Sequence, residues 1–105
     1  MNSDKRLKVY KLLKKIPRGR VSTYGALASR LGMNPRLVGR ILGQNSHPEI
    51  YPCYRVVRSD GSLGGYTIDS VNNEHSLSVK KKRLLRDGVK FSGERVEKKL
   101  IMKTI

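Results

Sequence analysis

One residue in the sequence combines strong nucleophilicity with surroundings that could activate it. Cys53 is the only cysteine of the chain and follows Pro52, in a segment that prolines and glycines interrupt. Tyr54 and Arg55 come directly after it, and Arg58 lies nearby in the sequence. The thiolate is the reactive form of cysteine, and positive neighbours lower the pKa of a thiol. The pattern allows nucleophilic chemistry, although a lone cysteine is more often a small buried hydrophobic residue.

The composition disfavours several other kinds of site. Cys53, His47 and His75 do not supply the four ligands of a structural zinc site, so we expect no metal and no cofactor. One cysteine makes an internal disulfide impossible, and a lone thiol fits a reducing compartment, cytoplasmic or nuclear, better than secretion. No apolar run approaches the roughly 18 residues of a membrane span, and the N-terminus lacks a hydrophobic signal core. We therefore expect no membrane partner.

The charge of the chain indicates a polyanionic partner. Of 105 residues, 23 are Lys or Arg and 8 are Asp or Glu, so the formal net charge is +15. This length allows one small domain, expected to span 1–105. Basic residues gather over 5–20 and 80–103, and their repulsion destabilises a compact state unless a polyanion relieves it. A solvated basic surface is one alternative, and a membrane-surface helix is another, although it would lack Trp or Phe on its apolar side.

Apolar residues at helical spacing predict three helices in the first half of the chain, the first over about 4–15. The expected capping residues are Ser3 for the first helix, Ser22 or Thr23 with Gly32 for the second, and Asn34 for the third. The third helix is expected to have Pro35 at its first position and to end at Gly43. The second and third helices, joined by a tight turn, form a helix-turn-helix pattern. Arg36 and Arg40 lie on the outward face of the third helix, where their repulsion favours a phosphate or base opposite. Gly39 on that face indicates either a close helix contact or close approach to a nucleic-acid backbone.

The second half of the chain is more irregular. Residues 54–57 have strand character and 59–62 read as a turn, which predicts a small hairpin or wing. A helix is expected from about Leu77 to Arg86, closed by Gly88, and a short hairpin over 89–96. The last nine residues give no clear prediction. The expected fold is mainly α, a winged-helix-like helix-turn-helix domain with a small β-hairpin.

Several segments resemble the DNA-binding and active-site domain of the O6-alkylguanine-DNA alkyltransferases. They are residues 16–28 (IPRGRVSTYGALA), 34–39 (NPRLVG), 50–57 (IYPCYRVV), 59–66 (SDGSLGGY) and 82–89 (KRLLRDGV), together with Asn45. The segments agree with that family in order and spacing over about residues 5–96. The resemblance is therefore more specific than any single motif.

The resemblance implies a DNA repair reaction that occurs once per protein molecule. Members of the family bind double-stranded DNA containing O6-alkylguanine through the minor groove, flip the base out of the stack, and transfer the alkyl group irreversibly to their own cysteine. Carried onto this sequence, Cys53 is the acceptor, Tyr24 gives the base a proton or hydrogen bond, and Asn45 supports the active-site turn. Arg36 fills the space that the base leaves. The implied DNA-binding residues are Arg36, Gly39, Arg40, Thr23, Tyr66 and Thr67.

The sequence departs from the family pattern at the residues expected to activate the cysteine. Tyr54 stands where the family usually has the His that passes a proton through water toward a Glu, and Asp87 stands in place of that Glu. A phenol with a pKa of about 10 is a poorer base at neutral pH than an imidazole at about 6.5. Thr67 replaces the usual serine of the base-pocket loop. The N-terminal domain of the common alkyltransferases is also expected to be absent, as in the alkyltransferase-like proteins.

Three functions follow from these observations. The first is a methylated-DNA–cysteine S-methyltransferase that acts once, as a monomer. The second is an alkyltransferase-like protein in which Cys53 is inert, and which binds the lesion and flags it for a separate repair enzyme. The third is an ordinary helix-turn-helix regulator, which would prefer a DNA sequence and ignore lesions.

Overall fold

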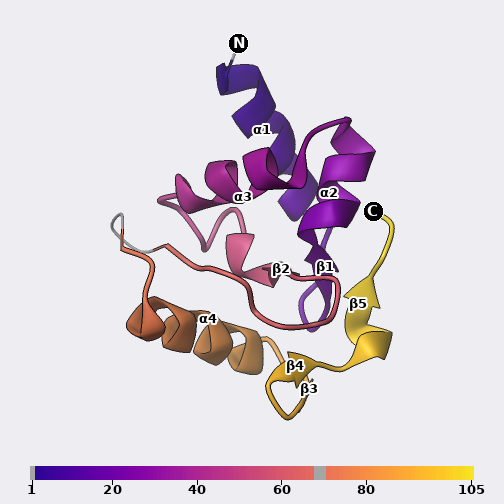
Figure 1. Ribbon diagram of the computed structural model, residues 1–105, viewed down its shortest axis with the longest axis vertical. Coiled ribbons are helices and arrows are strands. Elements are labelled where there is room, and N and C mark those ends of the chain that lie inside the picture. The colour runs from indigo at the N-terminus through magenta and orange to yellow at the C-terminus, as the bar shows by residue number, and fades with distance from the viewer. Residues whose placement is uncertain (1, 68–70) are drawn as a thin grey trace.

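Three helices are joined through a narrow parallel sheet to a fourth helix and a hairpin (Figure 1). The computed structural model describes residues 2–67 and 71–105, with the backbone alone for residues 2–4. Helices α1 (Asn2–Leu13), α2 (Tyr24–Leu31) and α3 (Pro35–Gly43) pack against one another. Helix α4 (Glu74–Arg86) comes after the long connection from α3. Cys53–Arg55 and Lys98–Leu100 each form a 3₁₀ turn. The mainly helical class is confirmed, and the winged-helix label stays a prediction.

The caps predicted for the second and third helices are confirmed. The Thr23 side chain accepts a hydrogen bond from the Ala26 amide (3.0 Å) at the start of α2, and Gly32 closes that helix with a φ of 65°. Asn34 caps α3 by accepting a hydrogen bond from the Arg36 amide (2.8 Å). These caps fix where each helix begins, and they place α3 directly after α2 in the helix-turn-helix arrangement.

Two predicted helix starts are wrong. Helix α1 begins at Asn2, so Ser3 lies within the helix and is not its N-cap. Helix α4 begins at Glu74, three residues before Leu77. Its early start follows from a capping box, in which Asn73 and Ser76 each bind the backbone amide of the other. The added first turn of α4 buries Ser76, while Glu74 and His75 stay exposed.

The central strand of the sheet was not predicted. Strand β1 (Val21–Thr23) lies between β2 (Val56–Val57) and β5 (Ile101–Met102) and is parallel to both. The hairpin or wing expected over residues 54–62 is therefore wrong, because β2 pairs with β1. The turn within that segment does form, since the Gly61 amide donates to the Arg58 carbonyl (2.9 Å). The hairpin predicted over 89–96 is confirmed as β3 (Phe91–Ser92) and β4 (Arg95–Val96).

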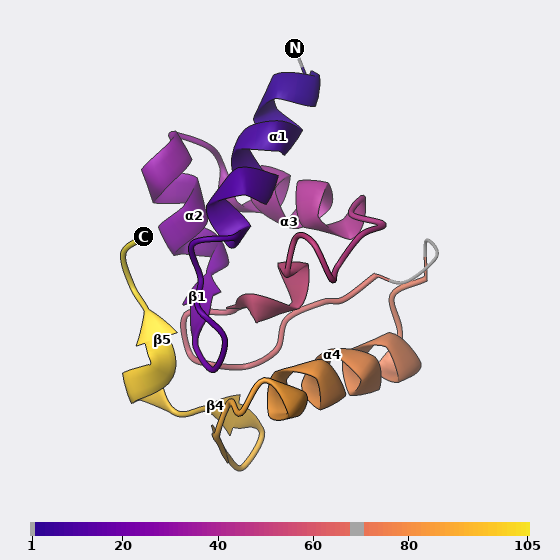
Figure 2. The same ribbon diagram turned by 180° about the vertical axis from the view of Figure 1, so that it is seen from behind.

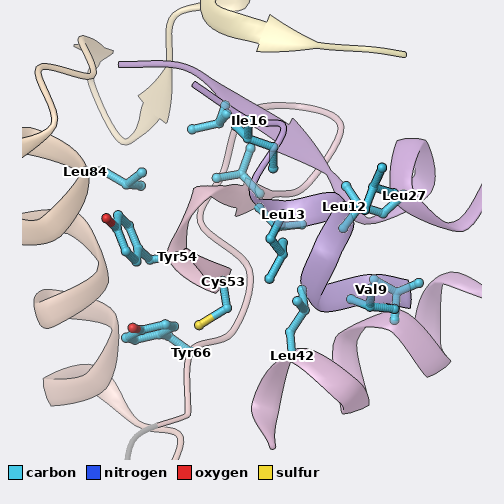
Figure 3. Close-up of a cluster of buried hydrophobic side chains, with 14 of the residues drawn as sticks. Val9, Leu12, Leu13, Ile16, Leu27, Leu42, Cys53, Tyr54, Tyr66 and Leu84 are labelled. Atoms are coloured by element: carbon cyan, nitrogen blue, oxygen red, sulfur yellow. The ribbon is translucent and has the colours of Figure 1, made fainter. Parts of the chain in front are cut away.

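The hydrophobic core joins the helices to both sides of the sheet. Val9, Leu13 and Leu27 come from the three-helix group, Val56 from the sheet and Leu84 from α4, and all five are fully buried. Figure 2 shows α4 and the β3–β4 hairpin on the far side of the sheet from α1. Cys53 lies at the edge of this core (Figure 3). No helix of the described residues is long and apolar enough to cross a membrane.

Candidate functional site

Cys53 opens onto a pocket of about 260 Å³ between α3 and the chain that follows β2. The residues that line it are Tyr24, Gly39, Leu42, Gly43, Cys53, Arg58, Gly64, Gly65, Tyr66, Thr67 and Asn72. Five of the predicted site residues are among them, namely Tyr24, Gly39, Cys53, Tyr66 and Thr67. The resemblance therefore selected residues that the fold brings together from four separate segments. The volume suits a single small ligand group.

Cys53 is held at the start of its 3₁₀ turn by local hydrogen bonds. Its amide donates to the Tyr51 carbonyl (2.7 Å), which also accepts a hydrogen bond from Asn45 Nδ2 (2.7 Å). Asn45 Oδ1 in turn accepts from the His47 amide (3.0 Å). Asn45 thus braces the segment before the cysteine, which is the supporting position that the resemblance implied.

Burial is the main influence on the Cys53 thiol. The side chain is 6% exposed, and this burial raises the pKa of the thiol, because it disfavours the charged thiolate. Hydrogen bonding by Asn45 and Tyr66 lowers that pKa, as do the positive charges of Lys80 and Arg83. The Cys53 sulfur points toward Tyr66 (Figure 3). The site contains groups that stabilise a thiolate and, by its burial, resists forming one before a substrate arrives.

Tyr24 carries a hydroxyl group into the pocket from the first position of α2. Its hydroxyl donates to the Gly65 carbonyl (3.4 Å) and accepts from Lys80 Nζ (3.4 Å). Burial raises its pKa, so the hydroxyl keeps its proton at neutral pH. Gly64 permits this position, because a Cβ there would lie 3.0 Å from the Tyr24 oxygen, and its φ of 72° favours glycine. A Cβ on Gly39 would lie 3.8 Å from the Tyr24 ring, which is an ordinary contact distance, so the packing of this ring does not require glycine there.

Lys80 is a buried cation beneath the pocket that the sequence reasoning missed. Only 1% of it is exposed. Its ammonium group donates to the carbonyls of Leu63 and Gly65, the latter at 3.1 Å, and to the Tyr24 hydroxyl. Burial lowers the pKa of Lys80 to about 7. Lys80 therefore connects α4 to Tyr24 and to the pocket loop, the segment that contains Leu63 and Gly65. The available signal was its helical spacing with Ser76 and Leu84, the two other buried residues of α4.

Arg83 is a second residue of α4 that the sequence reasoning missed. Its Nη1 donates a hydrogen bond of 2.8 Å to the Tyr66 hydroxyl. Its guanidinium carbon lies 5.9 Å from the ring centroids of both Tyr66 and Tyr54. Burial raises the pKa of Tyr66, whereas Arg83 lowers it. Arg83 thus fixes the orientation of the Tyr66 hydroxyl beside the cysteine.

Tyr54 and Asp87 do not line the pocket with Cys53. Tyr54 is 5% exposed, and it borders a separate hollow with Arg83. Asp87 Oδ2 accepts a hydrogen bond from Arg55 Nε (2.8 Å), and Oδ1 lies 3.6 Å from Arg18 Nε. Arg55 also donates to the Ile16 carbonyl (2.9 Å), so this ion pair ties the end of α4 to the turn after α1. Their predicted roles in proton transfer stay predictions, and the geometry gives Asp87 a structural role.

Helix α3 borders the pocket and carries exposed positive charge. Gly39, Leu42 and Gly43 of α3 line the pocket, while Arg36 and Arg40 of the same helix are exposed. Arg40 also borders a second hollow, with Lys5 and Arg6 of α1. A polyanion lying along α3 would therefore reach the mouth of the pocket. The DNA contacts expected of Arg36, Gly39 and Arg40 stay predictions on a surface with suitable charge.

The remaining predictions concern Thr23, Thr67 and metals. Thr23 is 7% exposed and its hydroxyl caps α2, so its DNA contact stays a prediction. Thr67 lines the pocket and packs against Gly43. A Cβ on Gly43 would lie 3.3 Å from the Thr67 hydroxyl oxygen. Over 2–67 and 71–105, the structure has no cluster of three or more His, Cys, Asp and Glu side chains that could hold a metal ion.

Comparisons with known proteins agree with this geometry. The family described as "6-O-methylguanine DNA methyltransferase, DNA binding domain" matches residues 4–89. A methylated-DNA–protein-cysteine methyltransferase from Pyrobaculum aerophilum is 49% identical over 73 residues, which cover 70% of this chain and 45% of that protein. A bifunctional methyltransferase/endonuclease from Picrophilus torridus is 41% identical over 93 residues, which cover 87% of this chain and 29% of that protein. The chain thus spans less than half the length of these two relatives.

A solved structure resembles the chain over almost its whole length. It is the crystal structure of S. pombe Atl1 in complex with damaged DNA containing O6-carboxymethylguanine. The TM-score is 0.76 and the sequence identity 28%, and the match covers 96% of each chain. The archaeal O6-methylguanine-DNA methyltransferase of Pyrococcus kodakaraensis KOD1 matches with a TM-score of 0.65 and 39% identity, over 80% of this chain and 46% of that one.

Proposed function

The chain belongs to the 6-O-methylguanine DNA methyltransferase DNA-binding domain family, and on that premise we propose that it repairs O6-alkylguanine in duplex DNA. It binds the minor groove, flips the alkylated base, and transfers the alkyl group irreversibly to Cys53. The observation that carries this proposal is the shared pocket, in which Cys53 and Tyr24 meet beside the basic helix α3. A DNA-binding helix alone would not need a nucleophile at the bottom of a pocket.

The proposed transfer step uses Cys53 and Tyr24, which line the same pocket. The Cys53 thiolate attacks the alkyl carbon, a carbon–sulfur bond forms, and the bond from that carbon to O6 breaks. The electron pair passes to the guanine, which takes up a proton and leaves neutral. Tyr24 supplies that proton or a hydrogen bond, and Lys80, which donates to the Tyr24 oxygen, stabilises the phenolate that results. The thiol proton passes to solvent water before the attack, a loss that the positive charges of Lys80 and Arg83 favour, and the Tyr24 phenolate regains a proton from solvent afterwards.

Binding and flipping of the base depend on α3. A base inside a duplex cannot present its O6 substituent to a side chain, so it must rotate out at a cost of a few kcal/mol. Arg36, exposed in the first turn of α3, fills the vacated space and offsets part of this cost. The net charge of +15 supports phosphate contacts along the rest of the interface.

A second candidate function is lesion binding without transfer. Two observations favour it: burial raises the pKa of Cys53, and Tyr54 and Asp87 do not join the pocket. The likeness to Atl1 over 96% of each chain supports the same alternative. In this case the chain flags the lesion for a separate repair enzyme. The Picrophilus torridus relative, whose name joins a methyltransferase with an endonuclease, supports a nuclease in that role.

Intact-protein mass spectrometry distinguishes these two functions. The chain is mixed with a duplex containing one O6-methylguanine, and its mass is compared with that of the Cys53→Ser variant under the same treatment. Transfer predicts that the mass of the wild-type chain rises by one methyl group in place of a hydrogen, while the variant is unchanged. An unchanged wild-type mass together with tight, lesion-selective binding would favour the second function. Selectivity for a DNA sequence and none for the lesion would indicate the helix-turn-helix regulator.

A further inference from the structure

Arg58, which the sequence presented only as a positive neighbour of Cys53, is a pocket residue that has no part in the proposed transfer step. It lines the same pocket as Cys53 and Tyr24. Its position follows from the sheet, because Thr23 of β1 pairs in parallel register with Val57 of β2. The next residue after each, Tyr24 and Arg58, therefore leaves the sheet at the same end.

The backbone around Arg58 is fixed by the turn that follows. The Arg58 amide donates to the Ser62 carbonyl (2.9 Å), and the Arg58 carbonyl accepts from the Gly61 amide (2.9 Å). Gly61 has a φ of 88°, and a Cβ there would lie 2.8 Å from the Val96 carbonyl oxygen, so the β3–β4 hairpin packs against this turn. These two bonds fix the backbone from which the Arg58 side chain starts, and the exposed side chain borders the pocket.

The nearest acid in the sequence is engaged elsewhere. Asp60 Oδ1 accepts hydrogen bonds from the amide (2.9 Å) and the hydroxyl (2.6 Å) of Ser62, and Oδ2 lies 3.7 Å from Arg95 Nη2. Among the described residues, no Asp or Glu lines the pocket, and Arg58 forms no ion pair. The wall of the pocket therefore carries a guanidinium group with capacity to bind an anion.

We propose that Arg58 selects O6 substituents that carry a carboxylate, so that the chain prefers a guanine with an acidic adduct to one with a neutral adduct of the same shape. This proposal rests on the proposed function, because it needs the flipped guanine in the Cys53 pocket. A methyl group gains nothing from Arg58. A carboxylate on the alkyl carbon that faces Cys53 extends along the wall and pairs with the guanidinium, which binds carboxylates through two parallel hydrogen bonds.

The competing role for Arg58 is a contact with a DNA phosphate at the mouth of the pocket. The chemistry is the same, a guanidinium with an anionic oxygen, but the two roles differ in what they discriminate. A phosphate contact strengthens the binding of every duplex alike and adds about one unit to the salt slope. A contact with the adduct changes only the ratio between acidic and neutral adducts.

The test measures binding to four duplexes, with O6-carboxymethylguanine, O6-carbamoylmethylguanine, O6-methylguanine or guanine at one position. The carbamoylmethyl group is the neutral counterpart of the carboxymethyl group. The full chain carries Cys53→Ser, so that transfer does not disturb the equilibrium. Arg58→Met is compared with Arg86→Met, which removes the same charge from an exposed position of α4 outside the pocket.

We expect the unsubstituted Arg58 protein to bind the carboxymethyl duplex more tightly than the carbamoylmethyl duplex. Arg58→Met should reduce that ratio by about ten- to a hundredfold, the range for losing a hydrogen bond to a charged group, while Arg86→Met leaves it unchanged. An equal weakening of all four duplexes by Arg58→Met, or an unaltered ratio, would overturn the proposal. If the parent protein bound no lesion more tightly than guanine, the proposed function itself would fail, a different result from loss of the ratio alone.

Discussion

Replacing Gly64 with alanine tests whether the position of the Tyr24 hydroxyl governs the reaction. The substitution has two consequences that follow from the structure. Gly64 has a φ of 72°, and an L-residue in this left-handed region costs roughly 1–2 kcal/mol of stability. The new Cβ would also lie 3.0 Å from the Tyr24 oxygen and 3.1 Å from Cε2, so the ring must move by a few tenths of an ångström. Because misplacement by about 1 Å can cost a hundredfold in rate, we expect alkyl transfer to slow by roughly tenfold.

Gly93→Ala is the matched control for this prediction. Gly93 has a φ of 64° in the β3–β4 hairpin, and nothing lies within 4 Å of where its Cβ would stand. Both variants should lose similar stability in urea unfolding, measured as the unfolding free energy. Only Gly64→Ala should transfer the methyl group of an O6-methylguanine duplex more slowly in a single-turnover assay. If Gly64→Ala were destabilised like the control and still transferred at the wild-type rate, the position of Tyr24 would not govern the reaction.

Three further predictions follow from the site. Burial lowers the pKa of Lys80 to about 7 in the folded chain, against an ordinary value of 10.5. Above pH 7 the unfolded chain therefore keeps a proton on Lys80 that the folded chain has lost, so the unfolding free energy of the wild type should rise with pH relative to that of Lys80→Met. Urea unfolding should show this gain as about 1.5–2 kcal/mol between about pH 7 and about pH 8.5, and a constant difference would contradict it. Asp87→Asn should lower the unfolding free energy by about 3–5 kcal/mol, because it leaves the largely buried Arg55 unpaired. It should leave the single-turnover rate per folded molecule unchanged, and a large fall in that rate would make Asp87 part of the chemistry. Arg36→Ala should weaken lesion binding more than binding to undamaged duplex in fluorescence anisotropy, and an equal loss would argue against its role in the vacated space.

The local signals in the sequence predicted the helix-turn-helix pair because the relevant interactions are local. Thr23 and Asn34 cap helices through amides two or three residues away, and Gly32 takes the left-handed conformation at a helix end. Such contacts depend on neighbouring residues alone. The resemblance then placed Tyr24 and Cys53 in one site, although they are 29 positions apart, which spacing alone does not predict.

The sheet and the buried Lys80 could not be predicted from the sequence, because the residues that they contact are distant along the chain. Strand β1 has three residues, all buried on both faces, so it shows no alternation of polar and apolar side chains. Lys80 stands in a run of three lysines that is typical of a solvated helix face, and only the carbonyls of the pocket loop explain its burial. Asp87 was assigned to proton transfer because it stands where the resembled family has a Glu, and its hydrogen bond with Arg55, 32 positions away, appears only in the folded chain.

The most direct test of the central claim is a crystal structure of the Cys53→Ser chain bound to a duplex containing O6-methylguanine. The account predicts that the methylated guanine lies outside the base stack, in the pocket between Tyr24 and residue 53, with its methyl group facing the serine oxygen. It also predicts that Arg36 occupies the gap in the stack. A methylated guanine still paired within the duplex, or a duplex bound on a face away from α3, would contradict the account.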